Sequence, residues 1–232
     1  MTELPIRVLL VDDQELFRSG VAVTLGAEPD LEVVGQAADG YEAVRLVEET
    51  RPDVVLMDIR MPELDGVEAT RQIFAPAAAS RRDKPVRVIV LTTFNLDDRA
   101  ATAIRYGASG FLLKDTSPAS LGAAIRTVHS GTAVIGPGDL GTLLDQTVRA
   151  QIPLPREFET LTAKEREIVQ EIASGRNNAE IAASLFLSES TVKSHVGSVL
   201  RKLDLRDRVQ VVVFAYQHGL VPEGDARSKA DR

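Results

Sequence analysis

The chain has 232 residues, enough for one large domain or two small ones, and its 44% hydrophobic and 26% charged residues are typical of a soluble globular protein. Because the chain has no cysteine, its composition excludes disulfide scaffolds, zinc fingers, iron–sulfur sites and thiol catalysis. The apolar runs are too short to span a membrane, and the N-terminus MTELPIRVLLVDD turns acidic where a signal peptide would be basic. We therefore expect a cytoplasmic protein with no membrane partner.

The net charge of −7 argues against nucleic-acid binding when it is taken over the whole chain, but it is unevenly distributed. Residues 1–130 hold 14 Lys and Arg against 20 Asp and Glu, a net charge of −6, and residues 131–155 hold one against two. Residues 156–232 hold 12 of each and are neutral. The acidity therefore belongs to the first half, and the second half has to be judged by itself.

Residues 5–130 alternate short apolar runs with amphipathic stretches. Runs rich in β-branched residues and bounded by turn residues predict strands at 6–11, 31–37, 54–57, 86–91 and 110–113. Helical patterns lie near 15–26, 40–50, 65–74, 97–106 and 118–129. Five such units predict an α/β fold with a doubly wound, five-stranded parallel sheet covered on both faces.

Acidic residues follow two of these predicted strands. Asp12 and Asp13 come directly after the first strand, and Asp58 ends the third. Because parallel strands end at the same edge of a sheet, the three carboxylates should converge there. Their mutual repulsion calls for a cation, and Mg²⁺ is the cation that oxygen ligands suit. Thr92 at the end of the fourth strand and Lys114 after the fifth add a hydroxyl and an ammonium. The sequence therefore predicts a phosphoryl-transfer site.

Four segments in this order, VLLVDD, VVLMDIRMPELDG, VIVLTTF and GASGFLLKD, resemble the receiver domain of bacterial two-component response regulators, which has a flavodoxin-like fold. The resemblance implies that Asp58 accepts a phosphoryl group, that Asp12, Asp13, Asp58 and the carbonyl of Arg60 hold Mg²⁺, and that Lys114 pairs with the phosphoryl oxygens. It also implies that Thr92 hydrogen-bonds to the bound phosphoryl group and that Phe111 is the aromatic residue of the switch. Many relatives have proline after the lysine, whereas this chain has Asp115.

Residues 131–157 contain three prolines and one short amphipathic stretch near 140–148, so we interpret them as a linker. The segment GPGDLG at 136–141 matches GxGxxG but has no surrounding βαβ unit, and we reject a dinucleotide site there. Residues 158–222 read as purely helical, and Thr162 to Glu165 form a capping box that begins the first helix. The polar residues 223–232 are predicted to be a disordered tail.

A helix-turn-helix is predicted from a helix near 178–186, a turn at 187–188 and a helix near 189–203, followed by a last helix near 208–218. On a helical wheel for the 189–203 helix, an apolar side groups five residues, namely Val192, Val196, Val199, Leu200 and Leu203. The opposite side groups four small or polar residues, namely Ser190, Ser194, Gly197 and Arg201. Residues 188–208 carry five Lys and Arg against three Asp and Glu, so this helix has a free and locally basic face.

This second half resembles the LuxR-type DNA-binding domain over almost its full length, with LTAKERE, NAEIA and STVKSHVGSVLRKL as the specific segments. The resemblance implies a set of DNA-contacting residues on the 189–203 helix, namely Thr191, Lys193, Ser194, His195, Gly197, Ser198, Arg201 and Lys202. In such domains the last helix pairs two copies, and here an apolar face for pairing is predicted from Val209, Val212, Val213 and Tyr216.

Together the two halves resemble the NarL/FixJ family of response regulators. We expect a sensor histidine kinase to phosphorylate Asp58 and the protein to bind promoter DNA as a homodimer, promoting only its own phosphoryl transfer and hydrolysis. Phosphorylation either uncovers the DNA-binding helix or pairs two receivers, and both alternatives stay open. An aspartate-nucleophile phosphatase would need a second acid two positions after Asp58, where Arg60 stands. A receiver that only dimerises, without phosphorylation, is a third hypothesis.

Overall fold

The structure, a computed structural model, describes residues 4–79, 85–93, 98–131 and 152–221. The chain divides into two compact units, residues 1–134 and 135–232. The predicted amphipathic stretch at 140–148, the segment 136–141 and the predicted tail 223–232 lie outside the described residues. Among the described helices, none is long and apolar enough to cross a membrane.

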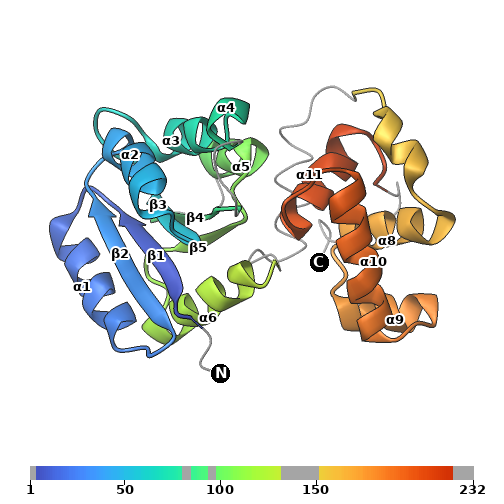
Figure 1. The fold of residues 1–232 in the computed structure, drawn as a ribbon, viewed down its shortest axis with the longest axis horizontal. Coiled ribbons are helices and arrows are strands. Elements are labelled where there is room, and N and C mark those ends of the chain that lie inside the picture. The colour runs from blue at the N-terminus through green and yellow to red at the C-terminus, as the bar shows by residue number, and fades with distance from the viewer. Residues whose placement is uncertain (1–3, 80–84, 94–97, 132–151, 222–232) are drawn as a thin grey trace, which may run out of the picture. The chain divides into compact units, whose positions relative to one another are not determined.

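The first unit is an α/β fold built on a five-stranded sheet (Figure 1). Its strands are β1 (Ile6–Val11), β2 (Leu31–Ala37), β3 (Val54–Asp58), β4 (Arg87–Thr92) and β5 (Gly110–Leu113). All pairings are parallel, in the order β2-β1-β3-β4-β5. The predicted sheet is confirmed, with differences of one residue at the ends of β3 and β4.

Helices cover both faces of the sheet (Figure 1). They are α1 (Glu15–Gly26), α2 (Gly40–Thr50), α3 (Gly66–Ile73), α4 (Pro76–Ala79), α5 (Asp98–Tyr106) and α6 (Pro118–His129). Helices α1 and α6 contact each other on one face, and α2, α3 and α5 form the layer on the other. The four-residue α4 was not predicted from the sequence.

The central strand β3 has all five residues buried, because neighbours on both edges and helices on both faces cover it. Leu56 is fully buried in a cluster with Val8, Ile89 and Ile125, which join β1, β4 and α6. This apolar packing is the main stabilising contribution to the unit and fixes the position of the strand that ends in Asp58.

The second unit is helical, as predicted. Its elements are the 3-10 helix η1 (Arg156–Thr160) and the α-helices α8 (Ala163–Ala173), α9 (Asn178–Leu185), α10 (Glu189–Lys202) and α11 (Arg208–Gln217). The predicted capping box of Thr162 and Glu165 is present at the start of α8, and a second, of Asn177 and Glu180, begins α9. The short η1 lies partly within the predicted linker and was not expected.

The two sides predicted for α10 are found in the structure. Val192 and Val199 are fully buried and Leu203 nearly so, whereas Val196 and Leu200 are half-buried. All four residues of the predicted outer side are exposed, namely Ser190, Ser194, Gly197 and Arg201.

The structure contradicts the prediction that α11 has a free apolar face for pairing. Val209, Val212 and Val213 have exposed fractions of only 0, 7 and 4% within this single chain, and Tyr216 is half-buried. The helix packs inside the unit against α8, as expected for a helix that is apolar almost all round. Its valines are therefore not a free surface.

Candidate phosphoacceptor site and DNA-facing helix

Four residues predicted for the phosphoryl-transfer site lie at the carboxyl ends of four strands. Asp12 follows β1, Asp58 ends β3, Thr92 ends β4 and Lys114 follows β5. The parallel register brings these ends to one edge, since Val11 lies opposite Met57 and Asp58 lies opposite Leu91. Asp12, Asp58 and Thr92 are buried, with exposed fractions of 2, 4 and 5%.

The predicted acidic cluster is formed. One carboxylate oxygen from each of Asp12, Asp13 and Asp58 lies within 4.8 Å of the others. Asp13 is exposed, so the cluster opens to solvent on its side. Three carboxylates at this separation repel one another and make an all-oxygen donor set, which fits a hard divalent cation such as Mg²⁺.

The ammonium of Lys114 joins two of these carboxylates. Its Nζ lies 2.7 Å from Oδ2 of Asp12 and 2.8 Å from Oδ2 of Asp58. Burial favours the uncharged amine, but the two hydrogen bonds to carboxylates outweigh it and raise the pKa of Lys114. Burial raises the pKa of the Asp58 carboxyl, against the opposing effect of the Lys114 ammonium. The site therefore holds both signs of charge away from water.

Backbone contacts hold these groups in place. The N–H of Gln14 donates to Oδ1 of Asp12 at 2.9 Å, and the N–H of Arg60 donates to Oδ1 of Asp58 at 3.3 Å. The N–H of Lys114 donates to the carbonyl of Thr92 at 2.7 Å, which ties the ends of β4 and β5 together. Phe111 is half-buried on β5, where it pairs with Val90.

The mouth of the site includes residues that the sequence did not indicate. An open hollow of about 580 Å³ is lined by Asp13, Arg60, Met61, Pro62 and Arg99. Arg99 belongs to α5, and its guanidinium lies 3.5 Å from Oδ2 of Asp65, the residue that caps α3. Arg99 comes from an element far along the chain, so no local motif marks it. Two arginines, Arg60 and Arg99, thus line the hollow beside Asp13.

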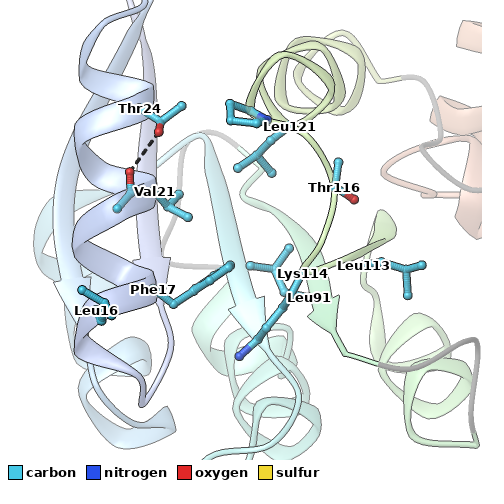
Figure 2. Close-up of a pocket in the computed structure, with 11 residues that line it drawn as sticks. Leu16, Phe17, Val21, Thr24, Leu91, Leu113, Lys114, Thr116 and Leu121 are labelled. Atoms are coloured by element: carbon cyan, nitrogen blue, oxygen red, sulfur yellow. Dashed lines mark hydrogen bonds between the residues drawn. The ribbon is translucent and has the colours of Figure 1, made fainter.

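A second, more apolar pocket of about 310 Å³ lies between α1 and α6, as Figure 2 shows. Phe17 and Val21 reach into it from α1, and Leu121 does so from α6. Lys114 also lines it, and its ammonium lies 5.1 Å from the centre of the Phe17 ring. The pocket is thus connected to the acidic cluster through Lys114, which contacts Asp12 and Asp58. The sequence did not indicate this pocket, because its apolar residues have the spacing of ordinary core-facing helix residues.

The predicted DNA-contacting residues all lie on α10, but their surroundings differ. Four are exposed, namely Lys193, Ser194, Gly197 and Arg201. Four are half-buried, namely Thr191, His195, Ser198 and Lys202. The ammonium of Lys202 contacts Oε2 of Glu165 at 2.7 Å and the carbonyl of Thr160 at 3.0 Å, both within its own unit.

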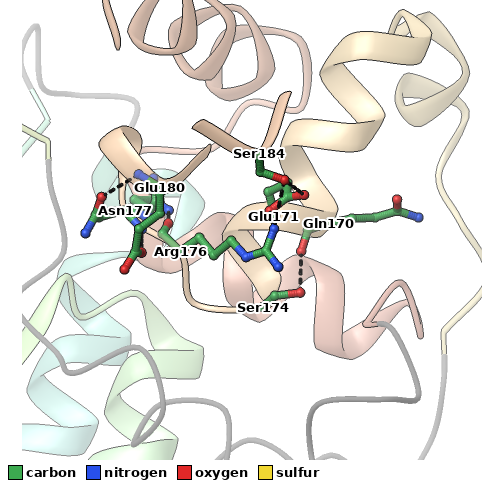
Figure 3. A network of polar contacts seen from close by, with 8 residues as sticks. Gln170, Glu171, Ser174, Arg176, Asn177, Glu180 and Ser184 are labelled. Carbon is green, nitrogen blue, oxygen red and sulfur yellow. Dashed lines mark hydrogen bonds and ion pairs between the residues drawn. The ribbon is translucent and has the colours of Figure 1, made fainter. Parts of the chain in front are cut away.

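A polar network that was not predicted fixes the helix before α10 (Figure 3). Glu171 on α8 forms an ion pair with Arg176 at 2.5 Å and accepts a hydrogen bond from the hydroxyl of Ser184 on α9 at 3.0 Å. Arg208 at the start of α11 donates to the carbonyl of Arg176 and to Oδ1 of Asn178. Burial lowers the pKa of Arg208 to about 10. Three helices are therefore joined around the loop that leads into α9.

Comparisons with known proteins agree with this division of the chain. The family described as response regulator receiver domain matches residues 8–126, and the family described as bacterial regulatory proteins, luxR family, matches residues 159–215.

Relatives of similar length match over nearly the whole chain. The transcriptional regulatory protein LiaR of Bacillus subtilis is 42% identical over 217 residues, covering 93% of this chain and 99% of the relative. An uncharacterized transcriptional regulatory protein of the same organism, YxjL, is 40% identical and covers 95% of this chain and 100% of the relative.

Among solved structures, a two-component response regulator of the LuxR family from Aurantimonas sp. SI85-9A1 is 33% identical. The match covers 62% of this chain and 99% of that structure, with a TM-score of 0.52. The chain therefore belongs to the NarL/FixJ family of two-component response regulators and combines a receiver domain with a LuxR-type DNA-binding domain.

Proposed function

We propose that Asp58 accepts a phosphoryl group from a sensor histidine kinase and that this modification controls promoter binding through α10. The observation that carries the proposal is the meeting of Asp12, Asp13 and Asp58 within 4.8 Å beside the buried ammonium of Lys114. A carboxylate attacks phosphorus only where the incoming negative charge is neutralised.

Mg²⁺ is the proposed cofactor, held by Asp12, Asp13, Asp58 and the carbonyl of Arg60. When bound, it would neutralise charge on the phosphoryl oxygens and on the cluster. The fit rests on the donor set, which consists of oxygen atoms only and is open to solvent at Asp13.

In the proposed transfer, a carboxylate oxygen of Asp58 forms a bond to phosphorus while the bond between phosphorus and the imidazole nitrogen of the donor breaks. The released imidazole takes up a proton. Lys114 then turns one of its N–H donors from carboxylate to phosphoryl oxygen, and it is already within reach, at 2.8 Å from Asp58. Thr92, buried at the end of the neighbouring strand, supplies a hydroxyl donor, and Phe111 on β5 follows the movement as the switch aromatic.

The second domain is proposed to bind promoter DNA as a homodimer. Lys193, Ser194, Gly197 and Arg201 form an exposed face on α10, and Thr191, His195 and Ser198 flank it. Small side chains permit close approach to a groove, and basic ones meet phosphates. We place the receiver at residues 5–130, the linker at 131–157, the DNA-binding domain at 158–222, and the protein in the cytoplasm.

The test is mass spectrometry of the intact protein after treatment with acetyl phosphate and Mg²⁺. The wild type should gain one phosphoryl group, and Asp58→Ala should gain none. Asp53→Ala, which changes an aspartate at the other end of β3, serves as the matched control and should still be modified. An unchanged adduct on Asp58→Ala would assign the acceptor to another residue.

A further inference from the structure

Of the two lysines predicted to contact DNA, Lys202 forms contacts within its own domain. Its ammonium lies 2.7 Å from Oε2 of Glu165 and donates to the carbonyl of Thr160 at 3.0 Å. Its side chain is one-quarter exposed. Lys193, on the same helix, is exposed. The two lysines of α10 therefore stand in different surroundings.

The partner of Lys202 is a buried carboxylate. Glu165 has an exposed fraction of 4%, and the same Oε2 atom accepts the backbone N–H of Thr162 at 2.7 Å. This hydrogen bond is half of the capping box that begins α8. Burial opposes ionisation of Glu165, but the contacts with Lys202 and Thr162 outweigh it and lower its pKa. The carboxylate thus stays charged with Lys202 as its counter-ion.

Moving Lys202 to a DNA phosphate would leave this carboxylate buried without a cation. Removing one partner of a buried ion pair costs far more than an exposed phosphate contact gains, because the remaining charge stays desolvated. The lysine also lies in the last turn of α10, whereas its partners lie where η1 ends and α8 begins. The contact therefore joins the C-terminal end of α10 to the N-terminal end of α8.

We propose that Lys202 is a positioning residue, which holds the C-terminal end of α10 against the start of α8 through Glu165 and makes no contact with DNA phosphate. The proposal rests on the proposed role of α10 in DNA binding. It corrects the assignment that the resemblance gave to this residue, and it leaves Lys193 and Arg201 as the cationic side chains of the exposed face.

The test compares Glu165→Gln, Lys202→Met and the double variant in the full-length protein treated with acetyl phosphate and Mg²⁺. Glutamine retains an acceptor for the capping box, so Glu165→Gln removes the charge while the helix start is kept. Fluorescence anisotropy with a labelled random-sequence duplex, over a series of KCl concentrations, gives the affinity and its salt dependence. No target site is needed, because phosphate contacts are independent of sequence. Each variant is measured well below its own unfolding midpoint.

The sign of the Glu165→Gln effect decides between the two roles. If Lys202 positions α10, each single variant should lower the affinity by about three- to tenfold, the double variant should cost no more than either single one, and the salt slope should stay that of the wild type. Lys193→Met should flatten the slope by about one. Glu167→Gln and Lys164→Met, which remove an exposed pair on α8, are controls for charge alone.

A phosphate contact gives the opposite pattern. Glu165→Gln would then leave the affinity unchanged or raise it, because it removes a negative charge and frees the ammonium, and Lys202→Met would flatten the slope by about one. Either result overturns the proposal while the proposed function stands. Wild-type protein that binds no duplex at low salt would overturn both, so the two failures are distinguishable.

Discussion

A Cβ atom placed on Gly66 would lie 1.9 Å from the carbonyl oxygen of Asp58. The loop after β3 therefore folds back onto the end of its own strand, and the N–H of Gly66 donates to the carbonyl of Ile59 at 3.0 Å. Any side chain at position 66 would force the loop away from the strand that carries the proposed phosphoacceptor.

We therefore predict that Gly66→Ala lowers the free energy of unfolding by about 2 kcal/mol or more, because a backbone atom of β3 cannot yield as a flexible side chain would. Denaturant unfolding measures the change, and the phosphorylation rate with acetyl phosphate should fall with it. Gly20→Ala in α1 is the control, since its Cβ would meet nothing within 4 Å, and should stabilise by about 0.5–1 kcal/mol. Equal effects of the two substitutions would contradict the close approach.

Lys114→Met should slow phosphorylation by acetyl phosphate about a hundredfold or more, because it removes the ammonium that lies 2.8 Å from Asp58. A quench assay of phosphoprotein formation gives the rate. Lys164→Met removes a lysine from the other domain and should leave the rate unchanged. A Lys114→Met rate close to that of the wild type would remove this residue from the proposed chemistry.

The raised pKa of Asp58 predicts a dependence of stability on pH. The folded state disfavours the charged carboxylate relative to the unfolded chain, so ionised Asp58 destabilises the fold, and the penalty is full above the folded pKa. Asp58→Asn should stabilise the protein at neutral pH by on the order of 1 kcal/mol.

This gain should shrink as the pH falls through the folded pKa of Asp58 and vanish below the unfolded value, where both states of the wild type are protonated. Urea unfolding at several pH values tests it. A gain that stays constant down to the most acidic condition would show that the carboxylate is not its source.

Mg²⁺ should raise the thermal midpoint of the wild type, since an ion that binds only the folded state stabilises it by mass action. Asp13→Asn removes one of the three converging carboxylates and should abolish most of the rise. Asp115→Asn changes an exposed aspartate of the same domain and serves as the control. If all three proteins respond alike to Mg²⁺ and EDTA, the ion binds elsewhere.

Gly197→Ala should separate stability from DNA binding. Its Cβ would meet nothing within 4 Å, so alanine should stabilise α10 by about 0.5–1 kcal/mol. If the exposed face lies against a groove, the same methyl group should weaken DNA affinity. Unfolding and anisotropy measurements on one sample test both halves, and an affinity that rises with stability would contradict groove proximity at this position.

The sequence predicted the sheet and the acidic cluster because both depend on local pattern and one topological rule. Five β-branched runs predict strands, and parallel strands end at one edge, so Asp12 and Asp58 meet although 46 residues separate them. The two sides of α10 follow likewise from helical periodicity, with Val192 inside and Ser194 outside.

Other features depend on which surfaces pack, and periodicity does not contain that information. From the sequence, the valines of α11 fit an interface as well as a core. In the structure they are core residues, because α8 packs against α11. Lys202 has the spacing of a phosphate contact, but Glu165, 37 residues earlier, takes its ammonium. Arg99 reaches the mouth of the site only because α5 lies beside α3.

The order of the strands also gives β3 and β5 different freedom to move. Asp58 ends β3, which has a partner on both sides and is buried throughout, whereas Phe111 lies on β5, a four-residue strand with one neighbour at the margin of the sheet. Amide hydrogen exchange should accordingly slow from β5 inward to β3. The proposed phosphorylation therefore falls on the strand that resists deformation, and the proposed switch aromatic lies on the strand where displacement costs least.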